Sequence, residues 1–486
     1  MTISRRDFMI SSSAILAAAG ASRVVYAAGA GEPDVIVIGA GLSGLGTALA
    51  LEEAGLRVLV LEGRERVGGR LYTLDDVPGH PEAGGNSVAS AYGRVIAAGQ
   101  KYGVELTNIF ARAFGSGQQA RSPQALFIAG KHVSLEDWPR HPRNHFPDAM
   151  KALPPWGFAE ALFQRHMPFT DLGRWFDPEF AKHDISVYEF LASNGASDAA
   201  IQLAYDTNIS YGTTAHDVSL LMHAAVAQWQ IVNRGAGGPP FIGAFKGGNQ
   251  RLPEAMARHL KGDLRKGQRV VAIGTRPDSA QVTCEDGTRH RAKAVVCSMP
   301  LSTLRHVAID PLPPPVQNAA IRTISYVPIT QVHVVPKKKF WESDGLNPTM
   351  WTDGITGTVY AQRFGPNPDE VMSLTAWARG LNAQYLDLLG PEAAGRAVLA
   401  ELERLRPASK GALTVAKVRS WATDPFAAGV WATFGPGQVT KFANELAKPH
   451  ERLFFCGEHT ALGSRGMEGA LESAERAAVE VQLALV

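Results

Sequence analysis

The segment that decides the fold is Asp34–Arg70, DVIVIGAGLSGLGTALALEEAGLRVLVLEGRERVGGR. It begins with the apolar run Val35–Ile38, which is typical of a buried parallel strand. A stretch rich in small residues follows and predicts a helix, and the β-branched run Val58–Leu61 predicts a second strand. Strand, helix and strand in this order form the first unit of a parallel, Rossmann-like sheet.

The turn between the first strand and the helix carries Gly39, Gly41 and Gly44 in G-x-G-x-x-G spacing. Glycines at these positions permit a tight turn and let backbone N–H groups approach a pyrophosphate, which the positive end of the helix also favours. Glu62, at the tip of the second strand, can accept hydrogen bonds from a ribose. The segment therefore predicts a dinucleotide site.

The end of this segment carries E-x-R-x-x-x-G-G-R, with Arg64, Gly69 and Arg70 at the defining positions. This pattern differs from that of nicotinamide enzymes and resembles the flavin amine oxidase superfamily, in which the segment surrounds FAD. The stretch around Gly84 and Gly85 resembles the second glycine motif of that superfamily, where backbone passes close to the flavin ring. The resemblance implies FAD as the cofactor.

Three more parts of the chain extend the resemblance. In relatives, the first of three strand-like runs after residue 267 provides a valine at the adenine end of FAD, and Val270 is the matching position. Gly457 and Glu458 end an apolar run near the C-terminus, and Glu458 is expected to bond the ribityl or phosphate region. A final helix from Met467 would direct its N-terminus at the pyrimidine edge of the flavin.

The resemblance also implies substrate contacts. Trp431 matches the first aromatic residue of the cage that guides the amine onto the flavin, and Gly466 matches the second. With glycine there, the cage has one wall, which leaves room for a bulkier or branched amine. Val430 stands where some monoamine oxidases carry the cysteine that links the flavin, so FAD is predicted to bind noncovalently.

One predicted site residue departs from the family pattern. Many relatives carry a lysine about nine residues before Phe-Trp, where it holds a water near flavin N5. Counting back from Phe340 and Trp341 places Gln331 there. Without the positive charge, re-oxidation by oxygen is expected to be slow, and a periplasmic electron carrier becomes the alternative acceptor.

The predicted fold class is α/β: a Rossmann-like FAD-binding domain interleaved with an α+β substrate domain, as in amine oxidases. The FAD-binding domain is assigned residues 33–107, 246–319 and 424–486, and the substrate-binding domain residues 108–245 and 320–423. Helical patterns at Val187–Ala192, Ala199–Tyr205 and Val218–Trp229 predict a helical cap in the substrate domain. The run His290–Ser298 is predicted to be β-like, and Val295–Pro300 is predicted to be the strand that returns to the nucleotide sheet.

Composition narrows the function classes. A chain of 486 residues is long enough for two domains. Its formal net charge of +2 gives no strong field that would recruit nucleic acid or anionic lipid. The three cysteines, Cys284, Cys297 and Cys456, lack metal-ligand spacing, and the two in apolar runs are predicted to be buried free thiols. No metal-ligand cluster is apparent.

The N-terminus predicts export. Paired arginines, Arg5 and Arg6, precede an alanine-rich apolar stretch that ends near Ala27. These are the features of a twin-arginine signal, so residues 1–27 are assigned to a signal peptide and the mature protein to the periplasm. The apolar stretch is too short and interrupted to be a good membrane span, so no stable membrane insertion is expected.

The predicted reaction is the oxidation of an amine at its C–N bond to an imine, which hydrolyses to an aldehyde or ketone. The acceptor is oxygen or the periplasmic carrier. Because exported bacterial relatives include enzymes of nicotine breakdown, a secondary or N-methyl amine of that kind is one predicted substrate. Two alternatives stay open: a flavin desaturase of the phytoene desaturase or protoporphyrinogen oxidase type, and a non-catalytic FAD-binding protein. A homodimer is also left open.

Overall fold

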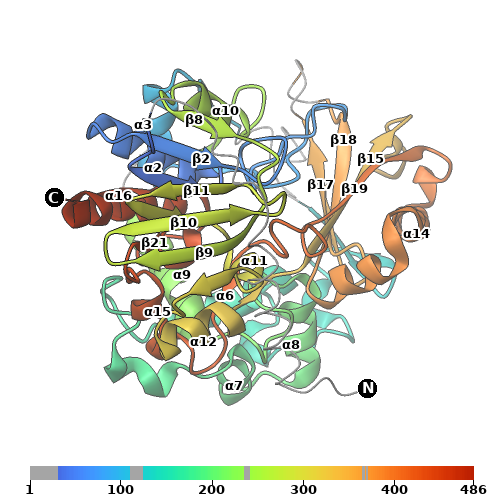
Figure 1. Cartoon of the computed structure of the whole chain (residues 1–486). Helices are drawn as coiled ribbons and strands as arrows, with labels where there is room; N and C mark the ends of the chain where they lie inside the picture. The colour runs from blue at the N-terminus through green and yellow to red at the C-terminus, as the bar shows by residue number, and fades with distance from the viewer. Residues whose placement is uncertain (1–30, 110–123, 235–240, 364–366, 368–369, 486) are drawn as a thin grey trace, which may run out of the picture.

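The computed structural model describes residues 31–109, 124–234, 241–363, 367 and 370–485 (Figure 1). The predicted signal peptide, residues 1–27, lies outside the described residues. Within them the chain forms an α/β protein, which confirms the predicted fold class. The predicted domain boundaries stay a prediction.

A five-stranded parallel sheet forms the nucleotide-binding part. Its strands, in the order β21-β12-β1-β2-β8, are β21 (Leu453–Phe455), β12 (Ala294–Cys297), β1 (Val35–Ile38), β2 (Val58–Leu61) and β8 (Asp263–Arg265). These strands come from stretches of chain that are far apart in sequence. The sheet is therefore complete only when the last strand, β21, is in place.

Alternate residues of β1 face opposite sides of this sheet, as strand geometry requires. Val35 and Val37 pack with the apolar residues of the helices α2 and α16. Ile36 and Ile38 pack on the other side, in a cluster with residues of a second sheet. All four are buried, which explains why the run has no polar residue.

Two helices cover the first side. The first, α2 (Leu42–Glu53), packs against α16 (Gly466–Leu485), so the N-terminal and C-terminal parts of the chain lie side by side (Figure 1). A Cβ added to Gly46 of α2 would lie 3.0 Å from the Cβ of Ala474. Small residues on both helices thus allow the close approach.

The second sheet is mixed, with the order β11-β10-β9-β13. Its strands are β9 (Val270–Arg276), β10 (Ser279–Cys284), β11 (Arg289–Ala292) and β13 (Ala308–Asp310). The β-like run His290–Ser298 is divided between two sheets, and its second part joins the parallel sheet, as predicted for Val295–Pro300. The chain leaves β11 in this sheet, turns at Lys293, and enters β12 in the parallel sheet.

The predicted substrate-binding domain contains a seven-stranded sheet with one long helix against it (Figure 1). The helix is α14 (Leu381–Leu405), which is kinked at Gly390 and packs on three strands of the sheet. The strands, in the order of the sheet, are β19 (Leu413–Ser420), β15 (Ile329–Pro336), β18 (Ser373–Arg379), β17 (Thr358–Gln362), β16 (Met350–Thr352), β5 (Ala125–Ile128) and β6 (Lys131–Val133).

A group of helices lies at the bottom of Figure 1, and the three helical patterns predicted for the cap are confirmed there as α7, α8 and α9. The group comprises α6 (Pro155–Arg165), α7 (Val187–Ser193), α8 (Asp198–Ala204), α9 (Leu220–Arg234), α12 (Pro315–Thr323) and α15 (Val439–Leu446). The remaining elements are α3 (Gly93–Lys101), α10 (Arg251–Arg258), α11 (Leu301–Leu304), α13 (Phe340–Asp344), β3 (Val88–Ala89), β4 (Leu106–Asn108), β7 (Ile242–Phe245), β14 (Ser325–Tyr326) and β20 (Ala432–Thr433).

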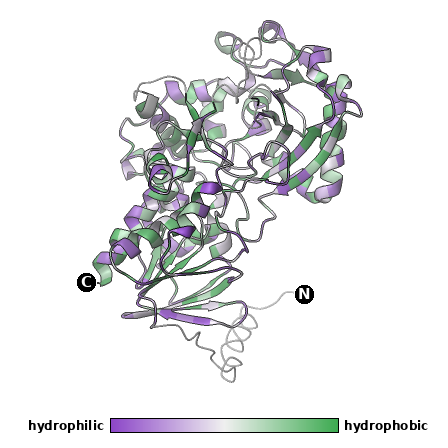
Figure 2. Ribbon diagram, turned by 90° about the horizontal axis from the view of Figure 1, so that it is seen from above, coloured by the Kyte–Doolittle hydropathy of each residue, from purple (hydrophilic) through white to green (hydrophobic). Residues whose placement is uncertain are grey.

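Several strands are coloured as hydrophobic, the helices carry both hydrophobic and hydrophilic residues, and a strand at the lower edge of the view is largely hydrophilic (Figure 2). The three cysteines are free and buried, which confirms the prediction made for Cys297 and Cys456. Across the part of the chain that the structure describes, no helix is both long and apolar enough to cross a bilayer. In the same part, no group of three or more His, Cys, Asp or Glu side chains could hold a metal ion.

Candidate active site

A large cavity opens at the carboxyl ends of β1 and β2, where open parallel sheets bind ligands. It contains about 1750 Å³ of space between atoms, part of it open to solvent. Its lining runs from the glycine turn and Glu62 at one end to Gln331 and Trp431 at the other. The predicted nucleotide-binding and substrate-binding residues therefore share one cavity.

The nucleotide end of the cavity is organised by Glu62. Its carboxylate accepts hydrogen bonds from the backbone N–H of Ala40 at 2.7 Å and of Arg64 at 2.8 Å. These bonds fix the carboxylate against the turn that follows β1. Each carboxylate oxygen accepts one of these bonds and can accept another, so Glu62 can still accept the hydrogen bonds predicted from a ribose.

Two glycine segments meet beside this turn. A Cβ added to Gly69, whose φ is +56°, would lie 3.4 Å from the Cα of Gly41. Both residues line the cavity, so backbone forms this part of its wall. A wall without side chains exposes N–H groups to a phosphate. Gly44 does not line the cavity. A Cβ there would lie 1.9 Å from the carbonyl oxygen of Gly39, so only glycine fits at this position. Its role is to let α2 pack against the turn.

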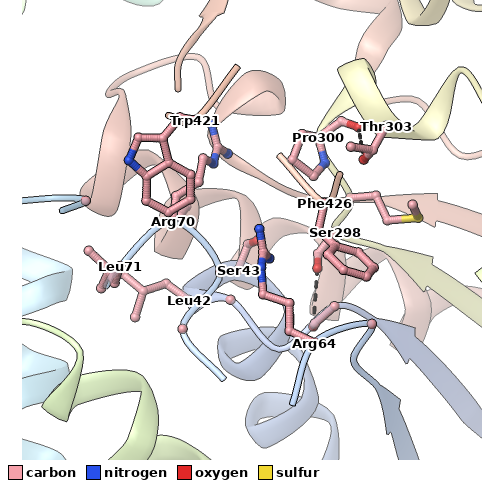
Figure 3. Close-up of a pocket in the computed structure, with 18 of the residues that line it drawn as sticks. Leu42, Ser43, Arg64, Arg70, Leu71, Ser298, Pro300, Thr303, Trp421 and Phe426 are labelled. Carbon is pink, nitrogen blue, oxygen red and sulfur yellow. Dashed lines mark hydrogen bonds between the residues drawn. The ribbon is translucent and has the colours of Figure 1, made fainter. Parts of the chain in front are cut away.

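A cluster of charged side chains connects two separate pieces of the predicted FAD-binding domain, residues 33–107 and 424–486. The guanidinium of Arg64 lies 2.5 Å from the carboxylate of Asp424, which also pairs with Arg419. Phe426 lies against Arg64, with 5.1 Å from the guanidinium carbon to the ring centroid. Figure 3 shows Arg64, Phe426 and Ser298 on one side of the cavity. The hydroxyl of Ser298 donates to the Ile38 carbonyl at 2.7 Å (dashed in Figure 3).

Glu458 is the buried acid of the C-terminal motif. One of its oxygens lies 2.9 Å from Arg70 and accepts from the backbone N–H of Ala432 at 3.1 Å. Burial raises the pKa of Glu458, but the positive charges of Arg70 and Arg465 outweigh it, so the pKa lies below its usual range. The other oxygen, Oε2, is buried and has no hydrogen-bond partner among the described residues. A hydroxyl donor brought by a ligand would satisfy it.

Gln331 lies on β15 and lines the cavity, fully buried. With its amide oriented to satisfy both atoms, it donates to the Ala83 carbonyl at 2.9 Å and accepts from the indole N–H of Trp377. The indole N–H of Trp421 donates to the same Ala83 carbonyl. Gln331, Trp377 and Trp421 therefore form one hydrogen-bonded part of the cavity wall, next to the second glycine motif at Gly84 and Gly85.

Trp431 and Gly466 are neighbours on the cavity wall. A Cβ added to Gly466 would lie 3.9 Å from the indole nitrogen of Trp431 and 3.9 Å from the hydroxyl of Tyr92. A methyl group at this position would therefore be in ordinary van der Waals contact with both side chains and would clash with neither. Tyr92 approaches it from another part of the chain.

The structure brings together all the predicted site residues except Gly44 and Gly457 at this cavity. Gly457 stands behind it, where its φ of +127° and the close His459 ring leave no room for a side chain. The residues at the cavity are Gly39, Gly41, Glu62, Arg64, Gly69, Arg70, Gly84, Gly85, Val270, Gln331, Trp431, Glu458, Gly466 and Met467. The roles given to them stay predictions.

Sequence reasoning missed several wall residues. Trp377, Trp421, Phe426 and Ser298 all line the cavity, and Asp424 holds Arg64 behind it. Trp421 and Phe426 lie within ten residues of Trp431, so the position of Trp431 could have indicated that they also line the cavity. Trp377 carries no local signal, because only the pairing of β15 with β18 places it opposite Gln331.

Glu82 supports the second glycine motif and titrates unusually. Its carboxylate accepts from the backbone N–H of Asn249 at 2.6 Å and from the Thr73 hydroxyl at 3.1 Å. Burial raises the pKa of Glu82 from 4.5 to about 7, against the effect of these hydrogen bonds. The folded state therefore keeps a proton that the unfolded chain loses, and this contribution to stability falls as pH rises from 4.5 to about 7.

The substitution Glu82→Gln tests this titration. An amide does not ionise, so we expect the stability of the variant, relative to the parent, to increase by about 2–3 kcal/mol between pH 5 and pH 8. Urea unfolding of both proteins across this range measures the difference. A difference that is the same at every pH would contradict the prediction.

The residues fit FAD. Glu62 is placed for a ribose, the glycine wall for a pyrophosphate, and the unpaired Oε2 of Glu458 for a hydroxyl of the ligand. None of the three cysteines lines the cavity, in agreement with noncovalent binding.

Comparisons with known proteins support this assignment. Human amine oxidase [flavin-containing] B is 27% identical over 476 residues, which are 92% of this chain and 86% of that protein. The L-amino acid oxidase Bs29 of Bothriechis schlegelii is 25% identical over 480 residues, with 93% and 90% covered.

Solved structures show the same fold. The cyclohexylamine oxidase from Brevibacterium oxydans has a TM-score of 0.74 at 21% identity, covering 94% of this chain and 100% of that one. A putrescine oxidase bound to putrescine has a TM-score of 0.72 at 22% identity, with 93% and 99% covered. The family model described as "Flavin containing amine oxidoreductase" matches residues 42–482. The chain therefore belongs to the flavin-containing amine oxidoreductases and is an FAD-dependent enzyme that oxidises amines.

Proposed function

We propose that this enzyme oxidises a bulky or branched amine, which binds between Trp431 and the open position at Gly466. The supporting observation is that a Cβ at Gly466 would meet nothing closer than 3.9 Å. A substituent of the substrate can occupy that space. The nicotine-related amine stays one prediction within this class.

The residues that would hold FAD follow from the geometry described above. Glu62 would bind the adenosine ribose, the backbone at Gly41 and Gly69 the pyrophosphate, and Glu458 a hydroxyl of the ribityl chain. When bound, FAD takes up the two electrons and the proton that leave the α-carbon of the amine as a hydride equivalent.

The protein's own contribution is to orient the amine and to exclude water. The indole face of Trp431 can hold the amine by aromatic and cation–π contacts. The opposite wall, made of Gln331, Trp377 and Trp421, has its polar atoms bonded within the protein. The substrate's C–N bond becomes C=N, and water then splits the imine into a carbonyl product and the released amine or ammonia.

Anaerobic reduction of the enzyme-bound FAD by a panel of amines tests this function. We expect branched, cyclic and N-alkylated amines to bleach the flavin absorbance faster than unbranched primary amines of the same carbon number. A panel in which unbranched amines react best would contradict the proposed substrate class. If only polyenes or porphyrinogens react, amine oxidation itself is wrong.

We also propose that the mature enzyme is periplasmic and passes its electrons to a carrier there. The paired arginines at the N-terminus support export in the folded state. Gln331 at the predicted lysine position supports a slow reaction with oxygen, and no lysine is among the described residues that line the cavity.

Stopped-flow mixing of the reduced enzyme with air-saturated buffer tests the choice of acceptor. We expect slow re-oxidation of the parent enzyme and a rate about 10-fold or more higher in Gln331→Lys, because a nearby positive charge stabilises the negative charge that oxygen gains. Rapid oxidation of the parent, or no gain in the variant, would contradict the proposal.

A further inference from the structure

Two tyrosines lie beside the proposed amine position. The Tyr92 hydroxyl and the Trp431 indole nitrogen are each 3.9 Å from the position that a Gly466 Cβ would occupy. The ring of Tyr211 lies near the same indole, with 6.0 Å between the centroids. Trp431 is therefore accompanied by tyrosines from two other parts of the chain.

Both tyrosine rings are held in place. Tyr92 packs edge-to-face on Trp229 of α9, with 5.6 Å between the ring centroids. Tyr211 packs edge-on against His223 at 5.3 Å, and its carbonyl accepts from the Tyr205 hydroxyl at 3.1 Å. Rings fixed in this way present their hydroxyls in defined positions.

The two hydroxyls have no partner within the described part of the molecule. Burial raises the pKa of both tyrosines, so each keeps its proton at neutral pH and can donate a hydrogen bond. Both tyrosines are only partly buried, and they lie next to Trp431 and Gly466 of the cavity wall. Two donors without acceptors therefore lie close to Trp431.

Charges of both signs act on this pair. Besides burial, Glu468 raises the pKa of Tyr92 and Glu458 raises the pKa of Tyr211, but these two carboxylates are paired with Arg94 and Arg70. The guanidinium of Arg465 lies 5.4 Å from the ring centroids of both Trp175 and Phe434 and donates to the Glu458 carbonyl at 3.1 Å. No carboxylate of the described residues forms an ion pair with it, because Glu458 is paired with Arg70. The charge of Arg465 acts on Tyr211, whose pKa it lowers against the effect of burial.

We infer that Tyr92, Tyr211 and Arg465 form a subsite for a carboxylate, so that the preferred substrate is an amine that also carries an acidic group. This rests on the proposed amine oxidation and adds to it the second functional group of the substrate. The hydroxyls would donate to the carboxylate, and Arg465 would supply the balancing charge from behind. The same field disfavours a second ammonium group, so diamines are expected to be poor substrates.

Three planar ligands of nearly the same shape separate charge from size: benzoate, benzamide and benzamidine, which are anionic, neutral and cationic at pH 7. Each is titrated into the oxidised holoenzyme, and binding is followed by the change in flavin absorbance, which needs no turnover. We expect benzoate to bind about 10-fold or more tightly than benzamide, and benzamidine more weakly than both.

Variants assign the preference to residues. Tyr92→Phe and Tyr211→Phe are each expected to weaken the binding of benzoate about 3–10-fold. Arg465→Gln is expected to abolish the preference for benzoate over benzamide. Arg465→Lys keeps the positive charge and is expected to retain part of the preference for benzoate. Tyr102→Phe is the matched control. Tyr102 lies at the opposite end of α3 from Tyr92, against His259, and its substitution should leave the binding of all three ligands unchanged.

Equal binding of the three ligands, or a benzoate preference that survives in Arg465→Gln, would overturn the subsite. Binding of none of them would overturn it as well. Failure of the proposed function appears differently, as a flavin that no amine reduces. Flavin reduction by n-butylamine as fast as by 4-aminobutanoate and 2-aminobutanoate would leave amine oxidation standing and contradict only the subsite.

Discussion

Gly44→Ala is expected to yield a protein that retains no FAD and is destabilised by about 4 kcal/mol or more. The added Cβ would lie 1.9 Å from the carbonyl oxygen of Gly39, which is a backbone atom. Gly39 cannot easily move away, because its N–H donates to the Leu61 carbonyl at 2.7 Å. The clash must therefore separate α2 from β1, at the place where the nucleotide binds. Flavin absorbance of the purified protein and its urea unfolding curve measure both effects.

Gly93→Ala is the matched control. Gly93 is the first residue of α3, and a Cβ there would meet no atom within 4 Å. Alanine favours helix over glycine by up to about 1 kcal/mol, so this variant should keep FAD and be at least as stable as the parent. If the Gly44→Ala protein binds FAD and its unfolding midpoint is unchanged, α2 does not need glycine at this position to pack against β1.

Glu458→Ala is expected to lower the free energy of unfolding by about 3 kcal/mol at pH 7 and to weaken FAD binding. The substitution leaves Arg70 and the N–H of Ala432 without their buried acceptor. Because the pKa of Glu458 lies below 4.5 in the folded protein, its contribution is complete above pH 4.5 and is lost as pH falls through the folded-state pKa. The difference from the parent should therefore shrink in acid.

Urea unfolding of the apoproteins at pH 7 and at pH 3.5 measures this difference. Glu392→Ala removes a carboxylate from an exposed pair with Arg396 and should change stability by less than about 0.5 kcal/mol. Equal stability of Glu458→Ala and Glu392→Ala would mean that the buried pair contributes no stability.

The parts of the site that sequence could predict are those that local pattern encodes. The G-x-G-x-x-G turn, the strands on either side of α2 and the acid at Glu62 lie within one short segment, and the structure has them as expected. Such a segment brings its own glycines, cap and apolar runs, so few distant contacts decide its conformation.

The parts that sequence could not predict depend on contacts between distant segments. No glycine or proline interrupts residues 290–298, yet the chain changes sheets at Lys293. Trp377 reaches the cavity through strand pairing, and Tyr92 reaches Gly466 through the packing of α3 near α16. Hydrophobic periodicity reports which residues are buried, but not which neighbours they meet.

The adjacency of α2 and α16 has a consequence for biosynthesis. While the ribosome is still adding residues, the nascent chain has its glycine turn but lacks β21, Glu458 and the helix that covers α2. The cofactor can then be captured only after translation ends. Any sorting step that removes the polypeptide from the cytosol must wait for that capture, or the enzyme would arrive without its flavin.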